Sequence, residues 1–132
     1  MAPAKLLLSI VELGGYPNFS PLYQSLGYTT VVENRMRKAI AFLRRQQPDV
    51  IVTEFNFQSD FRDRTSNLET LMAVLQRHPE VRVIVFYLPE QAEKLAILEA
   101  RFPLFAKIAF PITAEKLEPI LLEARDAPHV RS

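Results

Sequence analysis

Glu54 is the residue whose type and position most favour chemistry in this sequence. It stands near the end of an apolar run, Val50 to Phe55, which follows Pro48-Asp49 and has the β-branched composition of a buried strand. Open α/β sheets build their sites at the carboxyl ends of their strands. A carboxylate at that edge can hold a metal ion or take part in group transfer. Glu54 is therefore the first candidate site residue.

The other chemistry-bearing residues exclude several classes of site. The sequence has no Cys, which rules out disulfides and thiol chemistry. His78 and His129 have no partner at zinc-ligand spacing, and Ser9 has no evident base for a nucleophilic triad. Gly14-Gly15 lacks the further residues of a phosphate-binding loop. We therefore predict no catalytic residue, no metal site and no cofactor, and hence no enzyme.

Five apolar runs alternate with five amphipathic stretches, and these must position Glu54. The expected strands are 5–11, 28–32, 50–55, 81–88 and 105–110, each followed by a helix. Asn34 is expected to cap the second helix and Thr113 the last, and Ser66-Asn67-Leu68-Glu69 reads as a capping box for the third. The short connections predict an α/β fold with a parallel sheet and helices on both faces. We expect one domain, residues 1–125, and a C-terminal tail, residues 126–132.

The composition narrows the choice of partner. The chain of 132 residues is 48% hydrophobic and 23% charged, and its net charge is +1. That balance gives no reason to expect nucleic acid or an anionic membrane as a partner. No apolar run approaches the roughly 20 residues that span a bilayer. The basic side chains of the second helix, at 35, 37, 38, 44 and 45, could bind phosphates or an acidic partner, but we read them as a solvated helix face. The absence of Cys favours the cytoplasm.

Three junctions of the sequence resemble those of the response-regulator receiver domain. Leu26-Gly27-Tyr28 is similar to that family's entry to strand 2, and Pro48 to Thr53 is similar to its entry to strand 3. Phe110 to Leu117 resembles its Lys-Pro junction before helix 5. The three junctions are spread along most of the chain, from residue 26 to residue 117. The resemblance implies a doubly wound (βα)5 fold, with a five-stranded parallel sheet in the flavodoxin-like order 2-1-3-4-5.

The resemblance also shows which site positions have changed. Receivers hold magnesium with an acidic pair after strand 1, accept phosphate on an Asp after strand 3, and use a Thr or Ser and a Lys after strands 4 and 5. The acidic pair falls on Ile10-Val11 or Val11-Glu12, so that Glu12 is at most a vestigial metal ligand. The acceptor falls on Glu54, and Asn56 matches a position that binds metal through its carbonyl oxygen. The switch positions fall on Tyr87 (or Phe86), Phe110 and Pro111.

This pattern predicts a degenerate receiver, or pseudo-receiver, that acts as a protein-interaction module in bacterial signalling. Glu54 is then either a constitutive mimic of a phosphorylated aspartate, or an inert carboxylate or structural hydrogen-bond acceptor. Two alternatives stay open. One is an active phospho-receiver that uses Glu54, Glu12 and Asn56 with a metal. The other is a binder of a small molecule or nucleotide at the carboxyl edge of the strands.

The candidate contact residues are aromatic or apolar and lie in two places. Leu104, Phe105 and the Pro111 corner are on the helix 4–strand 5–helix 5 face, through which the resemblance implies a protein partner or a homodimer. Phe57 and Phe61 are in a long loop after Glu54. The sequence contains no output domain, so we expect a signal to leave by binding.

Overall fold

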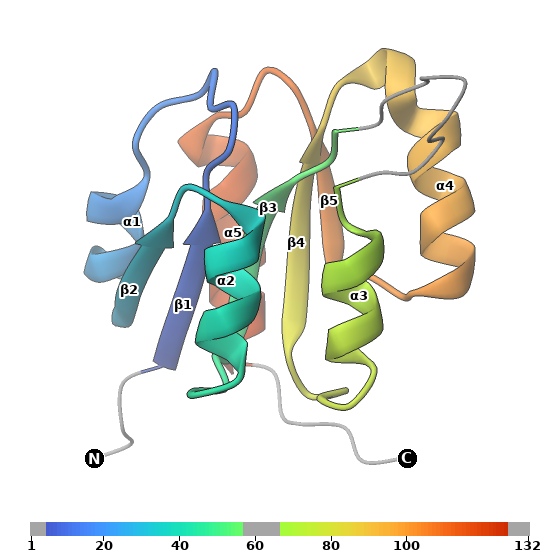
Figure 1. The fold of residues 1–132 in the computed structure, drawn as a ribbon. Helices are drawn as coiled ribbons and strands as arrows, with labels where there is room; N and C mark the ends of the chain where they lie inside the picture. The colour runs from blue at the N-terminus through green and yellow to red at the C-terminus, as the bar shows by residue number, and fades with distance from the viewer. Residues whose placement is uncertain (1–4, 57–66, 127–132) are drawn as a thin grey trace.

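The computed structural model describes residues 5–56 and 67–126, which form a five-stranded sheet flanked by helices (Figure 1). The strands are β1 (Lys5–Ile10), β2 (Tyr28–Glu33), β3 (Val50–Glu54), β4 (Arg82–Tyr87) and β5 (Ala106–Ala109). The helices are α1 (Ser20–Ser25), α2 (Met36–Leu43), α3 (Glu69–Leu75), α4 (Ala92–Arg101) and α5 (Ala114–Asp126), with a 3₁₀ turn, η1 (Pro89–Gln91), before α4.

All neighbouring strands run parallel, in the order β2-β1-β3-β4-β5. The predicted fold class and strand order are therefore confirmed. In Figure 1, α2 and α3 lie in front of the sheet, and α1 and α5 lie behind it. Helices on both faces explain why the strands read as continuous apolar runs rather than alternating ones.

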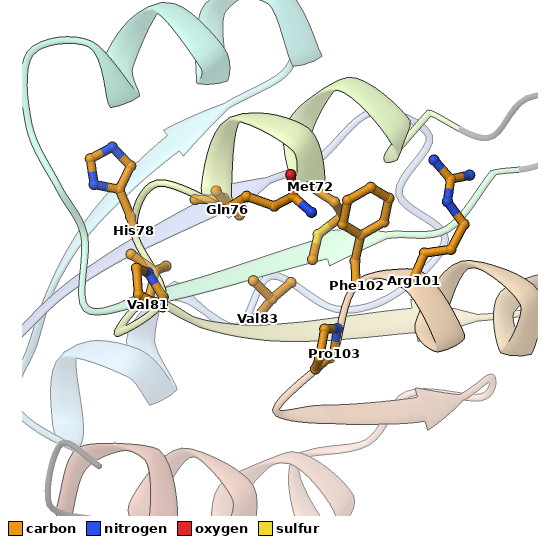
Figure 2. A pocket seen from close by; sticks show the side chains of 10 residues that line it. Met72, Gln76, His78, Val81, Val83, Arg101, Phe102 and Pro103 are labelled. Atoms are coloured by element: carbon orange, nitrogen blue, oxygen red, sulfur yellow. The ribbon is translucent and has the colours of Figure 1, made fainter. Parts of the chain in front are cut away.

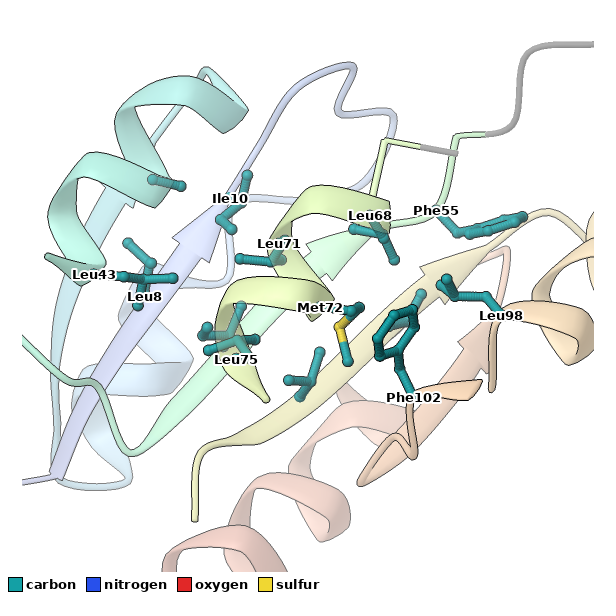
Figure 3. Packing of buried hydrophobic residues seen from close by; sticks show 14 of the residues in the cluster. Leu8, Ile10, Leu43, Phe55, Leu68, Leu71, Met72, Leu75, Leu98 and Phe102 are labelled. Atoms are coloured by element: carbon teal, nitrogen blue, oxygen red, sulfur yellow. The ribbon is translucent and has the colours of Figure 1, made fainter. Parts of the chain in front are cut away.

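Two hydrophobic clusters fill the two sides of the sheet, and β3 contributes to both. Val50 and Val52 belong to the cluster with α1 and α5, while Ile51 belongs to the cluster with α2, α3 and α4. Successive side chains of a strand point to opposite faces, so Glu54 shares the side of Val52. Figure 3 shows the second cluster, including Phe55. Phe55 is thus a core residue, in line with its place in the apolar run Val50 to Phe55.

Two predicted caps are corrected by the structure. The side-chain amide of Asn34 donates to the carbonyl oxygen of Val11 (3.1 Å) rather than capping α2, which begins after Arg35. Helix α3 begins at Glu69, with Leu68 as the N-cap residue and no side-chain cap, so it starts later than the expected capping box implies. Ser66 lies outside the described residues. For Asn34, a tertiary partner competes successfully with the local backbone.

The last helix begins as predicted. The Oγ1 atom of Thr113 accepts a hydrogen bond from the backbone N–H of Lys116 at 3.3 Å, and Pro119 lies inside α5.

No helix within residues 5–56 and 67–126 is both long enough and apolar enough to cross a membrane.

Candidate functional site

Glu54 ends β3 with its carboxylate buried, since only 3% of the residue is exposed. The carboxylate accepts four hydrogen bonds from the loop that follows β1. The donors are the backbone N–H groups of Leu13 (2.9 Å, to Oε1), Glu12 (3.2 Å, to Oε2) and Gly14 (3.2 Å, to Oε2), and the hydroxyl of Tyr16 (2.7 Å, to Oε2). Both carboxylate oxygens are therefore engaged within the chain. This is the geometry of a structural hydrogen-bond acceptor, one of the alternatives that the sequence left open.

Gly14 and Gly15 turn the chain between the N–H donors of residues 12 to 14 and the hydroxyl donor of Tyr16. Both glycines have positive φ angles, 76° and 86°, in the region that favours glycine. Successive N–H groups that converge in this way form an anion-binding concavity. The Gly pair lacks the sequence of a phosphate loop, and the anion held here is the chain's own Glu54.

Tyr16 covers the carboxylate with an aromatic ring that packs on two other rings. Its centroid lies 5.0 Å from that of Phe86 and 6.0 Å from that of Phe110, both in edge-to-face geometry. Burial, and then the hydrogen bond to Glu54, raise the pKa of the Tyr16 hydroxyl, so it stays a proton donor. Sequence reasoning missed this residue. The only signal was an aromatic hydroxyl directly after the Gly pair.

Asn67 joins the two residues expected to be vestigial metal ligands. Its Nδ2 atom donates to Oε1 of Glu12 (2.6 Å) and to the carbonyl oxygen of Glu54 (2.8 Å). Its Oδ1 atom accepts the N–H of Asn56 (2.7 Å), and its own N–H donates to the carbonyl oxygen of Asn56 (3.0 Å). The oxygens that a metal would need are thus engaged in protein hydrogen bonds. Within the described residues, no three His, Cys, Asp or Glu side chains gather into a metal site.

The receiver's magnesium therefore does not fit this edge of the sheet. Magnesium binds one or two free carboxylates and keeps several waters in octahedral geometry. Here the Glu54 carboxylate lies inside a concavity of N–H groups, which suit an anion and repel a cation. The donor set and its electrostatics both disagree with a divalent cation.

The switch positions lie on different sides of the sheet. Tyr87 is half-buried against the cluster of α2, α3 and α4, whereas Phe86 is fully buried under Tyr16. Phe110 is half-buried beside Tyr16, and Pro111 is exposed after a cis peptide bond. The ammonium group of Lys116 caps the carbonyl oxygens of Pro111 (2.8 Å) and Ala109 (3.3 Å).

The predicted contact residues are partly buried in the two clusters. Leu104 packs against the cluster of α2, α3 and α4, and Phe105 against that of α1 and α5, so they do not form one exposed patch. Phe57 and Phe61 lie outside the described residues. Large apolar side chains are instead exposed at Leu13 (78%) and Ile97 (63%), neither of which the sequence singled out.

Two pockets lie near opposite ends of the strands, one near their amino ends and one near their carboxyl ends. One, of about 280 Å³, lies between α3 and α4, where Figure 2 shows Gln76, Met72 and Phe102 side by side above Val83, with His78 to one side. It is close to the start of β4 and so is remote from Glu54. The other, also of about 280 Å³, lies beside Tyr16 and is lined by residues that include Ser9, Phe19 and Tyr23.

No family profile and no curated protein matches the sequence of this chain. Solved structures resemble its fold. The signal receiver domain of an HD domain-containing protein from Pseudomonas fluorescens Pf-5 has a TM-score of 0.75 at 14% identity, over 96% of this chain and 90% of that one. A response regulator receiver domain protein from Clostridium thermocellum has a TM-score of 0.72 at 17% identity, over 93% and 94%.

NtrX from Brucella abortus, solved in complex with ADP, has a TM-score of 0.72 at 19% identity. The match covers 95% of this chain but only 27% of NtrX, so the chain spans about a quarter of that protein. At these identities the likeness concerns the fold, and this chain has the fold of receiver domains. The residues around Glu54 must supply the argument for function.

Proposed function

We propose that this chain is a receiver-like protein-interaction module of bacterial signal transduction that does not accept a phosphoryl group and catalyses no reaction. The observation that carries the proposal is the hydrogen bonding of Glu54. Its oxygens accept three backbone N–H groups and the Tyr16 hydroxyl, and they are buried. Phosphoryl transfer requires an accessible oxygen in line with the leaving group.

Charge supports the same conclusion. Transfer to a carboxylate brings further negative charge to the site, which receivers balance with magnesium and a lysine. In this chain Phe110 takes the place of that lysine, and the ammonium of Lys116 caps backbone carbonyl groups. The carboxylate of Glu54 binds the donors of the loop after β1. It therefore serves as a structural hydrogen-bond acceptor inside the fold rather than as an exposed phosphate mimic.

Intact-mass spectrometry tests the chemical part of the proposal. The protein is incubated with acetyl phosphate and magnesium, beside a receiver domain with an aspartate acceptor as the positive control. We expect an adduct on the control and none on this chain. An adduct that maps to Glu54 would overturn the proposal in favour of an active receiver with an unusual site.

We place the protein-binding surface on the α4–β5–α5 face. Ile97 projects from α4 with 63% of its surface exposed, and β5 is an edge strand. A homodimer through this face should be visible by sedimentation equilibrium and should be weakened by Ile97→Asp. Val32→Asp, an exposed change on β2 at the opposite edge of the sheet, is the matched control. Equal effects of the two variants would argue against this face.

A small-molecule site is the second candidate, because a pocket of about 280 Å³ lies directly beside Tyr16. Its aromatic lining suits a planar ring, and NtrX, of similar fold, was solved with ADP. Thermal-shift measurements with ADP and flavin mononucleotide test this function. A stabilisation that Tyr23→Phe leaves intact and that a bulky Ser20→Trp removes would support it.

A further inference from the structure

Helix α2 and the residues at its two ends carry only positive charges, and the stability of the helix does not explain them. Five of the 16 Lys and Arg residues lie at 35, 37, 38, 44 and 45, and no Asp or Glu lies between Glu33 and Asp49. All five side chains are exposed. Within residues 5–56 and 67–126, none of them forms an ion pair with a carboxylate.

Three of these cations stand at the wrong end of the helix for stability. Arg35 is the N-cap residue, and Arg37 and Lys38 lie in the first turn, which contains no acidic residue. The N-terminus of a helix carries a partial positive charge, so cations there are unfavourable and carboxylates are preferred. A sequence that breaks a local rule without a gain in stability points to function.

The charged helix borders a groove whose lining also includes a residue of α3. The groove has a volume of about 370 Å³. Met36, Ile40 and Ala41 line it on the α2 side together with Arg37 and Arg44, and Thr70 lies on the α3 side. Arg37 and Arg44 are seven residues apart, so they lie on one face of the helix, about 10 Å apart along its axis. The apolar strip thus has a guanidinium group toward each end.

Asn67 also lines the groove and connects it with the Glu54 site. Its side chain bonds to Glu12 and to the carbonyl oxygen of Glu54. A molecule seated in the groove would therefore contact the residue that joins the loop after β1 to the end of β3.

We propose that this surface, formed by α2 and the α2–α3 groove, binds an acidic segment of a partner protein in which apolar side chains are flanked by Asp or Glu. The charge of the helix complements the carboxylates, and the apolar strip complements the side chains between them. Nucleic acid fits less well, because the chain as a whole carries only +1 and none of the described residues that line the groove is aromatic, so they offer no ring on which a base could stack. The proposal names the chemistry of a partner, and it does not depend on whether Glu54 accepts phosphate.

Fluorescence anisotropy with a designed pair of peptides tests the proposal. Each peptide has about 15 residues, long enough as a helix to span the surface, and places Leu between Glu residues spaced seven apart. The second peptide has Lys in place of every Glu. We expect only the Glu peptide to bind, and its affinity to fall as salt rises. The double variant Arg37→Glu/Arg44→Glu should weaken binding about tenfold or more, because attraction becomes repulsion at both ends.

Two further variants distinguish binding in the groove from a general effect of the protein's positive charge. Ala41→Glu adds a carboxylate to an exposed groove position without removing an arginine and should also abolish binding. Arg77→Glu reverses one charge, half the change of the double variant, at an exposed position outside the groove and should leave the affinity within about twofold. Circular dichroism confirms that each variant is folded.

The results that overturn the proposal are specific. They are equal binding of the Glu and Lys peptides, no binding of either, or loss of affinity in Arg77→Glu as large as in the double variant. A DNA duplex or phosphatidylglycerol vesicles that bind where the Glu peptide does not would assign the surface to another class of partner. The acetyl phosphate experiment tests the proposed function separately, so either idea can fail alone.

Discussion

Replacing Glu54 with alanine removes the acceptor of four hydrogen bonds at once. Hydrogen bonds to a charged group contribute about 1.5–3 kcal/mol each, and buried donors left without a partner carry a desolvation penalty of similar size. Two effects reduce the sum. The variant no longer buries a charge, which costs several kcal/mol in the wild type, and water can enter the space to satisfy some N–H groups. We expect a net loss of about 3 kcal/mol in the free energy of unfolding.

Glu54→Gln should cost less, about 2 kcal/mol, because one oxygen remains as an acceptor while the new amide group faces donors. Urea unfolding followed by circular dichroism measures both losses, and for a domain of this size the alanine variant should melt about 10 °C lower. Glu118→Gln is the matched control. That residue is exposed on α5, and its change should stay within about 0.5 kcal/mol. Added acetate should partly restore Glu54→Ala, since it can occupy the vacated N–H groups.

A different result would refute the reasoning. Stability within about 0.5 kcal/mol of the wild type would mean that Glu54 is an idle carboxylate. A gain in stability would mean that repulsion from the neighbouring Glu12 carboxylate outweighs the hydrogen bonds, as it does in a cluster of acids built for a metal. In that case magnesium should stabilise the wild type and not Glu54→Ala.

Three more predictions test other parts of the structure. Asn67→Ala removes the bonds to Glu12 and to the backbone and should lower the free energy of urea unfolding by about 2 kcal/mol; an unchanged midpoint would contradict the role given to this side chain. Burial raises the pKa of Tyr28 to about 12, whereas an unfolded tyrosine titrates near 10. Since the unfolded state then holds fewer protons, stability should fall from about pH 10 to about pH 12, and urea unfolding of Tyr28→Phe should show a shallower fall. Arg37→Glu places a carboxylate in the first turn of α2 and should raise thermal stability by about 0.3–1 kcal/mol; a loss would mean that Arg37 serves the fold.

The local pattern of apolar and capping residues was enough to predict much of the fold. The apolar runs identified all five strands, and the ends found differ from those expected by no more than one residue. Thr113 caps its helix as its position suggested. Asn34 matched a capping pattern equally well, but its amide bonds to Val11, because a tertiary acceptor lay within reach. A capping pattern describes only what the neighbouring residues offer.

The sequence by itself determined that a carboxylate ends the third strand and that the lysine and acidic pair of a receiver are missing. Only the tertiary structure decided what the carboxylate does. Three of its four partners are backbone N–H groups about 40 residues earlier in the chain. Every residue except proline has such a group, so no side-chain pattern marks which ones will converge. The pairing of β1 with β3 brings these groups to Glu54, and the turn at Gly14 and Gly15 is followed by Tyr16, the fourth donor.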